Sequence, residues 1–321
     1  MKSSNITNFI TQNSRKQLKS MKSIKVISIG VASLALAIGA AVMPAFAELD
    51  DFDRNRNGDI SPESTGYPLS RGGFPQWYKD KSGLKLDLCL DTLDALCIPA
   101  PLPDPTAEAV FPDNFSDEAF WWTAGAQATT VNGGFRASLV LATEAAFGNG
   151  DPAYGDQIVF NRTRIRINGG LINNRWYRIT YPYGRKELQA TTRDTRKPAT
   201  INFTEDFGCA PSLVTICDFG SIRAAGGRNG VTNLIGKPWL TWDNFDTDLN
   251  SLDPVIGARY VGDPNTAHTI KGSPIAVDPL IHRSGYQNFF KVEELTGMGG
   301  TVVRTIAYTD LFSVSGKVSE D

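Results

Sequence analysis

The residue pattern with the clearest chemical use is an acidic loop at residues 53–64. Side chains that carry oxygen recur there at alternate positions, as a hard cation such as Ca²⁺ requires when it gathers about six to eight oxygen ligands. The expected ligands are Asp53, Asn55, Asn57, Asp59, Ser61 and Ser64. Because few of these ligands are carboxylates, the sequence predicts weak calcium binding, roughly in the millimolar range.

The same loop resembles an EF-hand calcium loop. Gly58 stands at the sixth position, where the EF-hand chain turns sharply, and Asp59 would ligate through its backbone carbonyl. Two positions depart from the pattern, since Ser64 replaces the bidentate Glu at the twelfth position and Glu63 comes one place early. The alternative interpretation is a solvated acidic turn that binds no ion.

Residue types suited to catalysis occur elsewhere, but their spacing selects no site. The chain has two histidines in all, His268 and His282, which excludes multi-histidine metal sites. Either could orient a nucleophile, with Asp263 or Asp278 near it in sequence. Paired carboxylates for sugar hydrolysis could come from Glu144, Glu205, Asp206 or Asp243, yet with 34 acidic residues some pair is always available. The sequence therefore assigns no catalytic and no cofactor-binding residue.

A stretch of three arginines offers a binding surface. Arg162, Arg164 and Arg166 alternate with threonine and isoleucine, which places the three guanidinium groups on one face of a strand. One interpretation is a strip for an anionic polymer such as an acidic polysaccharide. The other, favoured by the pattern of ordinary half-buried strands, is a solvent-facing strand that pairs with acidic neighbours, with the aromatic residues of 176–183 in the core.

The first 47 residues have the composition of a secretory signal peptide. They hold six basic residues and no Asp or Glu, and an apolar run at 26–43 leads to Ala45 and Ala47, the small residues that a signal peptidase requires. We expect cleavage before Glu48. The alternative is an uncleaved anchor, because an apolar run of about 18 residues can span a bilayer.

Removal of that segment has consequences for compartment and partners. Either Met1 or Met21 could be the start of the chain. No second apolar stretch approaches membrane length, so we expect a periplasmic or extracellular chain without a membrane span. The whole chain has a formal net charge of −2, but the remaining 274 residues carry 26 basic against 34 acidic residues, a balance of −8. That balance argues against nucleic acid as a partner.

The four cysteines form two similar pairs. Seven residues separate Cys89 from Cys97 and Cys209 from Cys217, which is not the spacing of a zinc site. An oxidising compartment favours disulfides. Three connectivities are possible, of which we expect the two local bridges; the alternative is four free thiols.

Short strands dominate the sequence after residue 73. Apolar and polar residues alternate, or β-branched and aromatic residues cluster, in segments bounded by turn formers. These segments are 84–90, 137–142, 158–167, 176–181, 269–271, 289–292, 301–308 and 311–318. Two segments, 117–122 and 139–147, are helix candidates, and the second fits a strand equally well.

We therefore expect an all-β fold, a β-sandwich of the immunoglobulin or fibronectin kind with long loops. Two packed halves, residues 74–208 and 209–318, would follow an acidic polar segment at 48–73.

A set of motifs distributed over residues 74–318 resembles a family of uncharacterised secreted bacterial proteins. The motifs are Phe74-Pro-Gln-Trp-Tyr78, Leu86-Asp-Leu-Cys-Leu-Asp91, Asp117-Glu-Ala-Phe-Trp-Trp122, Ile179-Thr-Tyr-Pro-Tyr-Gly184, Ile201-Asn-Phe-Thr-Glu-Asp-Phe-Gly208, Trp239-Leu-Thr-Trp-Asp243, Tyr260-Val-Gly-Asp-Pro264, Lys271-Gly-Ser-Pro274 and Asn288-Phe-Phe-Lys-Val-Glu293. The resemblance implies export and a shared β-rich module. It implies no activity and supplies no catalytic residue.

Together these patterns predict a secreted or cell-surface, non-enzymatic module that binds a macromolecule, either a polysaccharide or a protein. One alternative is a secreted hydrolase that acts on a polysaccharide or an ester through a carboxylate pair. The other is a structural spacer.

Overall fold

The computed structural model describes residues 49–58, 64–129, 134–192, 197–209, 216–223, 239–245, 258–273, 277–278, 283–284 and 287–320. Every strand pair in this part of the chain is antiparallel, and its helical elements are two short 3-10 turns, η1 (Leu69–Arg71) and η2 (Ser221–Arg223). The predicted all-β class is confirmed. Among these residues, no helix has the length and apolar character needed to cross a membrane.

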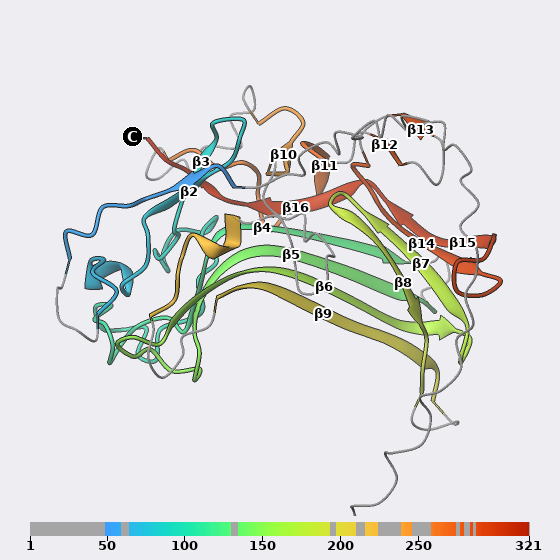
Figure 1. Cartoon of the computed structure of the whole chain (residues 1–321), viewed down its shortest axis with the longest axis horizontal. Helices are drawn as coiled ribbons and strands as arrows, with labels where there is room; N and C mark the ends of the chain where they lie inside the picture. The colour runs from blue at the N-terminus through green and yellow to red at the C-terminus, as the bar shows by residue number, and fades with distance from the viewer. Residues whose placement is uncertain are drawn as a thin grey trace, which may run out of the picture. The chain divides into compact units, whose positions relative to one another are not determined.

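The largest sheet has seven strands in the order β10-β11-β16-β4-β5-β6-β9 (Figure 1). Their bounds are β10 (Thr241–Trp242), β11 (His268–Lys271), β16 (Leu311–Ser315), β4 (Glu118–Thr129), β5 (Arg136–Phe147), β6 (Gln157–Leu171) and β9 (Ala199–Cys209). The four long strands β4, β5, β6 and β9 curve along their length (Figure 1). β16 comes late in the chain and lies between β11 and β4.

Three smaller sheets complete the described part. One has the order β15-β14-β7-β8, and a second the order β1-β2-β3-β17, while β12 and β13 pair alone. The bounds are β7 (Trp176–Tyr181), β8 (Gly184–Gln189), β14 (Phe290–Leu295), β15 (Val302–Thr309), β1 (Asp51–Phe52), β2 (Trp77–Lys79), β3 (Lys85–Asp87), β17 (Lys317–Val318), β12 (Val277–Asp278) and β13 (Arg283–Ser284). Strands from residues 74–208 and from residues 209–318 share three of the four sheets, including the seven-stranded one, and the segment at 48–73 contributes β1.

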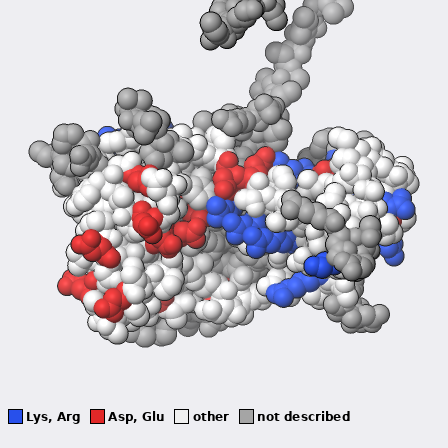
Figure 2. Space-filling model, turned by 90° about the horizontal axis from the view of Figure 1, so that it is seen from below, with Lys and Arg blue, Asp and Glu red and all other residues white. Residues whose placement is uncertain are grey.

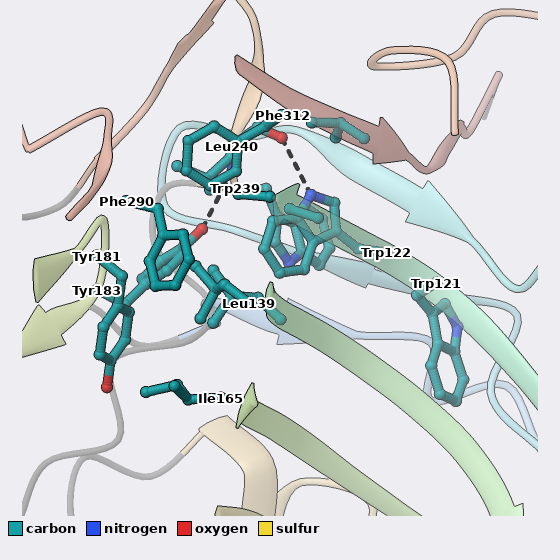
Figure 3. Close-up of a cluster of buried hydrophobic side chains, with 14 of the residues drawn as sticks. Trp121, Trp122, Leu139, Ile165, Tyr181, Tyr183, Trp239, Leu240, Phe290 and Phe312 are labelled. Atoms are coloured by element: carbon teal, nitrogen blue, oxygen red, sulfur yellow. Dashed lines mark hydrogen bonds between the residues drawn. The ribbon is translucent and has the colours of Figure 1, made fainter. Parts of the chain in front are cut away.

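The core is rich in aromatic side chains, and loop backbone is tied into it by hydrogen bonds. Trp122 on β4 donates its indole N–H to the carbonyl of Leu240 at 3.0 Å, and the Leu240 N–H donates to the hydroxyl of Tyr183 at 3.2 Å (Figure 3). The rings of Trp122 and Tyr183 meet edge to face with centroids 5.9 Å apart. These contacts hold the 239–242 segment against β4 and against the turn between β7 and β8.

The helix candidate at 117–122 is wrong, because these residues begin β4. The residues form a strand because the segment continues into Ala124, Ala126 and Ala128, which point into the core at every second position. A register shift between Phe120 and Trp122 lets the adjacent Trp121 and Trp122 both be buried, which hides the two-residue period at the start of the strand. For 139–147 the strand alternative is confirmed, as β5.

The two local disulfides are confirmed. Cys89 pairs with Cys97 and Cys209 pairs with Cys217, each with a Cα–Cα distance of 5.5 Å. The Cys89–Cys97 disulfide closes a loop beside β4, where the backbone of Cys89 forms an isolated β-bridge with that of Phe120.

Candidate functional site: an arginine face beside a row of charges

Side chains on the four long strands alternate between a core side and an outer face. On β6, Ile165 and Ile167 are buried in the core while Arg162, Arg164 and Arg166 point the other way. The predicted alternation of the three arginines is therefore confirmed. The strand register extends this outer face across β4, β5 and β9.

A row of four charged side chains crosses the outer face, one from each long strand: Glu118 on β4, Glu144 on β5, Arg162 on β6 and Asp206 on β9. Arg162 lies directly opposite Asp206 and donates two hydrogen bonds to its carboxylate, at 2.9 and 3.0 Å. A third nitrogen of Arg162 donates to Glu144 at 3.0 Å. One guanidinium therefore serves two carboxyl groups, and we call these four residues the charged row.

The environment of Glu144 favours its neutral form. Its side chain is 1% exposed, and this burial raises the pKa of Glu144 to about 8. The charge of Arg162 opposes the rise, whereas Glu118, which also hydrogen-bonds to Glu144, and Asp206 add to it. Burial alone would lower the pKa of Arg162, but its bond to Asp206 and the charge of Glu144 raise it above the ordinary value.

Among the described residues of β4, β5, β6 and β9, the outer face beyond the charged row carries arginine and no acid. Arg164 and Arg166 continue along β6, and Arg136 projects from β5 two strand positions beyond the Ser138–Arg166 pair. Within the described residues these three arginines, which we call the arginine face, form no ion pair. Arg136 donates to the side chain of Gln127 at 3.1 Å, and the Nε of Arg164 is buried without a hydrogen-bond partner.

Three neighbours of the arginine face can form hydrogen bonds, whereas Val140, the cross-strand partner of Arg164 on β5, is apolar. Register places Ser138 and Asn202 on either side of Arg166, and Thr204 beside Arg164. Asn202 and Thr204 are exposed. The arginine face can therefore bind a carboxylate or sulfate through guanidinium groups and hydroxyl groups through the flanking side chains.

The charges on this side of the molecule are segregated. β9 is the lowest strand of the seven-stranded sheet in Figure 1, so the view from below looks toward the β9 side. There, Asp and Glu side chains gather next to a group of Lys and Arg side chains (Figure 2).

Three basic residues that follow in sequence, Arg175, Arg178 and Lys186, form ion pairs in the described structure. Arg175 pairs with Glu294 at 3.2 Å, Arg178 with Glu187 at 2.9 Å, and Lys186 with Glu205 at 2.8 Å. Tyr177, Tyr181 and Tyr183 are buried in the core. For this stretch, the interpretation of ion-paired strands with core aromatics is confirmed.

The acidic loop is described in part. Asp53 is buried, and its carboxylate accepts the backbone N–H groups of Asn55 at 2.8 Å and Gln76 at 3.0 Å. Asn55 and Asn57 are exposed, Ser64 is buried, and Asp59 and Ser61 lie outside the described residues. Glycine is needed at position 58, because a Cβ there would collide with the backbone of Tyr67 and Pro68.

Within the described residues, no group of three or more His, Cys, Asp or Glu side chains is placed to hold a metal ion. The calcium site therefore stays a prediction that rests on the sequence of the loop.

The four carboxylates that could form a catalytic pair do not all lie together. Glu144 and Asp206 meet through Arg162, whereas Glu205 points to the other face of β9. Asp243 lies elsewhere and contacts His268 at 3.2 Å, while the hydroxyl of Thr269 donates to it at 2.6 Å.

Asp263, which is near His268 in sequence, instead accepts hydrogen bonds from Asn265 and Thr266 in its own turn. His282 and the side chain of Asp278 lie outside the described residues. Sequence reasoning missed Glu118, and only the strand register between β4 and β5 brings it to Glu144.

No family model, no curated protein and no solved structure matches the chain.

Proposed function

We propose that this chain is an exported, non-enzymatic β-rich module that binds an acidic polysaccharide through the arginine face. The observation that carries the proposal is the outer surface beyond the charged row, where Arg136, Arg164 and Arg166 are the charged residues and none is neutralised within the described structure. An unpaired, partly desolvated guanidinium binds a carboxylate or sulfate more strongly than a fully hydrated charge does.

The chemistry of the surface favours a polysaccharide over other polyanions. Ser138, Asn202 and Thr204 offer donors and acceptors for sugar hydroxyl groups beside the guanidinium groups. The balance of −8 after the first 47 residues disfavours nucleic acid. The two disulfides and the signal-like N-terminus support export to an oxidising compartment, where such polymers occur.

A binding role also suits the architecture that we infer. We propose that the seven-stranded sheet and the β15-β14-β7-β8 sheet form a sandwich of the immunoglobulin or fibronectin kind. The contacts of β4 with β14 and β15 support this arrangement. The likeness to secreted bacterial proteins and a weak calcium ion at 53–64 belong to the same proposal.

The hydrolase alternative has one observation in its favour, the neutral acid Glu144 beside the carboxyl group of Glu118. A general acid must reach the glycosidic oxygen, however, and Glu144 is 1% exposed and already bonded to Arg162. The geometry therefore favours binding over catalysis. The spacer alternative predicts no ligand at all.

The proposal is tested by calorimetric titration of the full-length protein with polygalacturonate, with dextran as a neutral polymer of similar flexibility. We expect binding of polygalacturonate alone, weakened about tenfold or more in the R164A/R166A double variant. The matched control removes two exposed basic residues away from the long strands, Lys81→Ala and Arg259→Ala. Equal losses in both double variants, or no preference for polygalacturonate over dextran, would overturn the proposal.

A further inference from the structure

The charged row and the arginine face are continuous along one strand. Arg162, Arg164 and Arg166 occupy successive outer positions of β6, about 7 Å apart from one to the next. Arg162 belongs to the charged row and has all three of its nitrogen types bonded to Glu144 and Asp206. The charge of the row therefore acts on the end of the surface where a polyanion would lie.

We propose that the Glu118–Glu144 pair regulates anion binding at the arginine face by gaining or losing one proton. The inference rests on the proposed function, because it concerns the affinity of that same surface for an anionic polymer.

The charges around Glu144 are unbalanced. The charged groups that face it are Glu118 from β4, Arg162 from β6 and Asp206 from β9. Its direct cross-strand neighbours, Phe120 and Phe160, carry no charge. One guanidinium thus stands against three carboxyl groups, so the row has a net charge of −2 when all three are ionised and −1 when Glu144 holds a proton.

Glu144 holds its proton in the neutral range and releases it in the mildly alkaline range. Burial, together with Glu118, raises the pKa of Glu144 to about 8. The uronate groups of a polysaccharide stay ionised throughout this range. The change of charge therefore takes place on the protein and within the charged row.

Loss of this proton weakens anion binding at the arginine face. Glu144 lies four residues along β5 from Val140, the cross-strand partner of Arg164, which places the new charge about 14 Å from the arginine face. At low ionic strength a unit charge at that distance weakens binding of an anion by about threefold. We therefore expect the anion affinity to fall as the pH rises through about 8.

The experiment measures polygalacturonate binding by the full-length protein at pH 7 and pH 9, at about 10 mM ionic strength so that screening is weak. Wild type should lose about threefold in affinity between the two values, and Glu144→Gln should keep its pH 7 affinity. Asp310→Asn, which removes an exposed carboxylate in the turn before β16, should behave as wild type.

A second variant guards against a Glu144→Gln protein that folds poorly. Glu118→Gln removes the like charge beside Glu144, so the pH at which affinity falls should move to a lower value. An equal pH dependence in wild type and both variants, or no dependence in wild type, would overturn the regulation alone. Absence of polygalacturonate binding at both pH values would overturn the proposed function and this inference with it.

Discussion

The guanidinium of Arg162 donates two hydrogen bonds to the carboxylate of Asp206, from Nε to Oδ1 at 2.9 Å and from Nη2 to Oδ2 at 3.0 Å. The two residues are direct partners in the register of β6 and β9. This bond divides the outer face, because it removes Arg162 from the arginine face and leaves a carboxylate at its border.

Asp206→Asn should strengthen binding of polygalacturonate. The substitution removes a carboxylate at the border of the surface and releases part of the charge of Arg162 toward the ligand. We expect a gain of about twofold to fivefold at low salt, measured by calorimetric titration. Asp310→Asn serves as the control for a general loss of negative charge, and an equal gain in that variant would contradict a local effect.

Stability should depend on pH through Glu144. The folded pKa of about 8 lies above the ordinary value near 4.3, so folding favours the protonated form. The contribution of this group is fully present below about pH 4 and is lost as the pH rises through about 8. Between pH 5 and pH 9, wild type should lose on the order of 3 kcal/mol of unfolding free energy relative to Glu144→Gln.

Urea denaturation of both proteins at pH 5, 7 and 9 measures this difference. If the difference in unfolding free energy between the two proteins is the same at all three pH values, Glu144 titrates alike in the folded and unfolded chain.

Removal of the first disulfide should destabilise the protein by about 2–3 kcal/mol, because a closed loop of this size restricts the unfolded chain to that extent. The variant is Cys89→Ser with Cys97→Ser, measured by urea denaturation. Alkylation of the denatured wild type without reductant should modify none of the four cysteines, and incorporation of label would contradict the pairing.

Tyr183→Phe should cost about 1–2 kcal/mol of stability. The hydroxyl accepts the N–H of Leu240, and its removal leaves that buried N–H without this partner. Tyr154→Phe removes a hydroxyl from a side chain that is 42% exposed and should have almost no effect in the same denaturation assay. Similar losses in the two variants would show that the bond to Leu240 contributes nothing.

The calcium prediction is tested better at Asn57 than at Asp53. Asp53 binds two backbone N–H groups, so Asp53→Ala should lower the melting temperature with or without Ca²⁺. Asn57 is exposed, and Asn57→Ala should leave the calcium-free melting temperature unchanged while it reduces the rise caused by millimolar Ca²⁺. A wild type that shows no rise with Ca²⁺ would contradict the site.

The strands that sequence reasoning found are those whose side chains differ clearly between the two faces. On β6 the arginines and isoleucines alternate, and the pattern alone places both sets correctly. On β4 the core positions are alanines, which carry little hydrophobic contrast, and the strand was mistaken for a helix at its start. Strand β9, where exposed residues such as Asn202 and Thr204 alternate with half-buried ones, was not predicted for a similar reason.

The contacts within the charged row could not be predicted from the sequence for a different reason. Glu144 and Asp206 were among the candidate carboxylates, but nothing in the sequence ties either one to Arg162. Their meeting depends on the register of β5, β6 and β9, and a shift of one residue would send each side chain to the opposite face. The same holds for Asp243 and His268, which β10 and β11 bring together.

The position of β16 between β11 and β4 has a consequence for how the chain folds. Hairpin contacts link β4 to β5 and β5 to β6, and these can form as soon as their residues are present. The other edge of β4 stays open until residues 313–315 arrive, from far along the chain. Pairing over such a sequence separation is slow. Sheet completion is therefore a late kinetic event, and until it occurs the open edge of β4 presents unpaired backbone N–H and C=O groups with which another chain can pair.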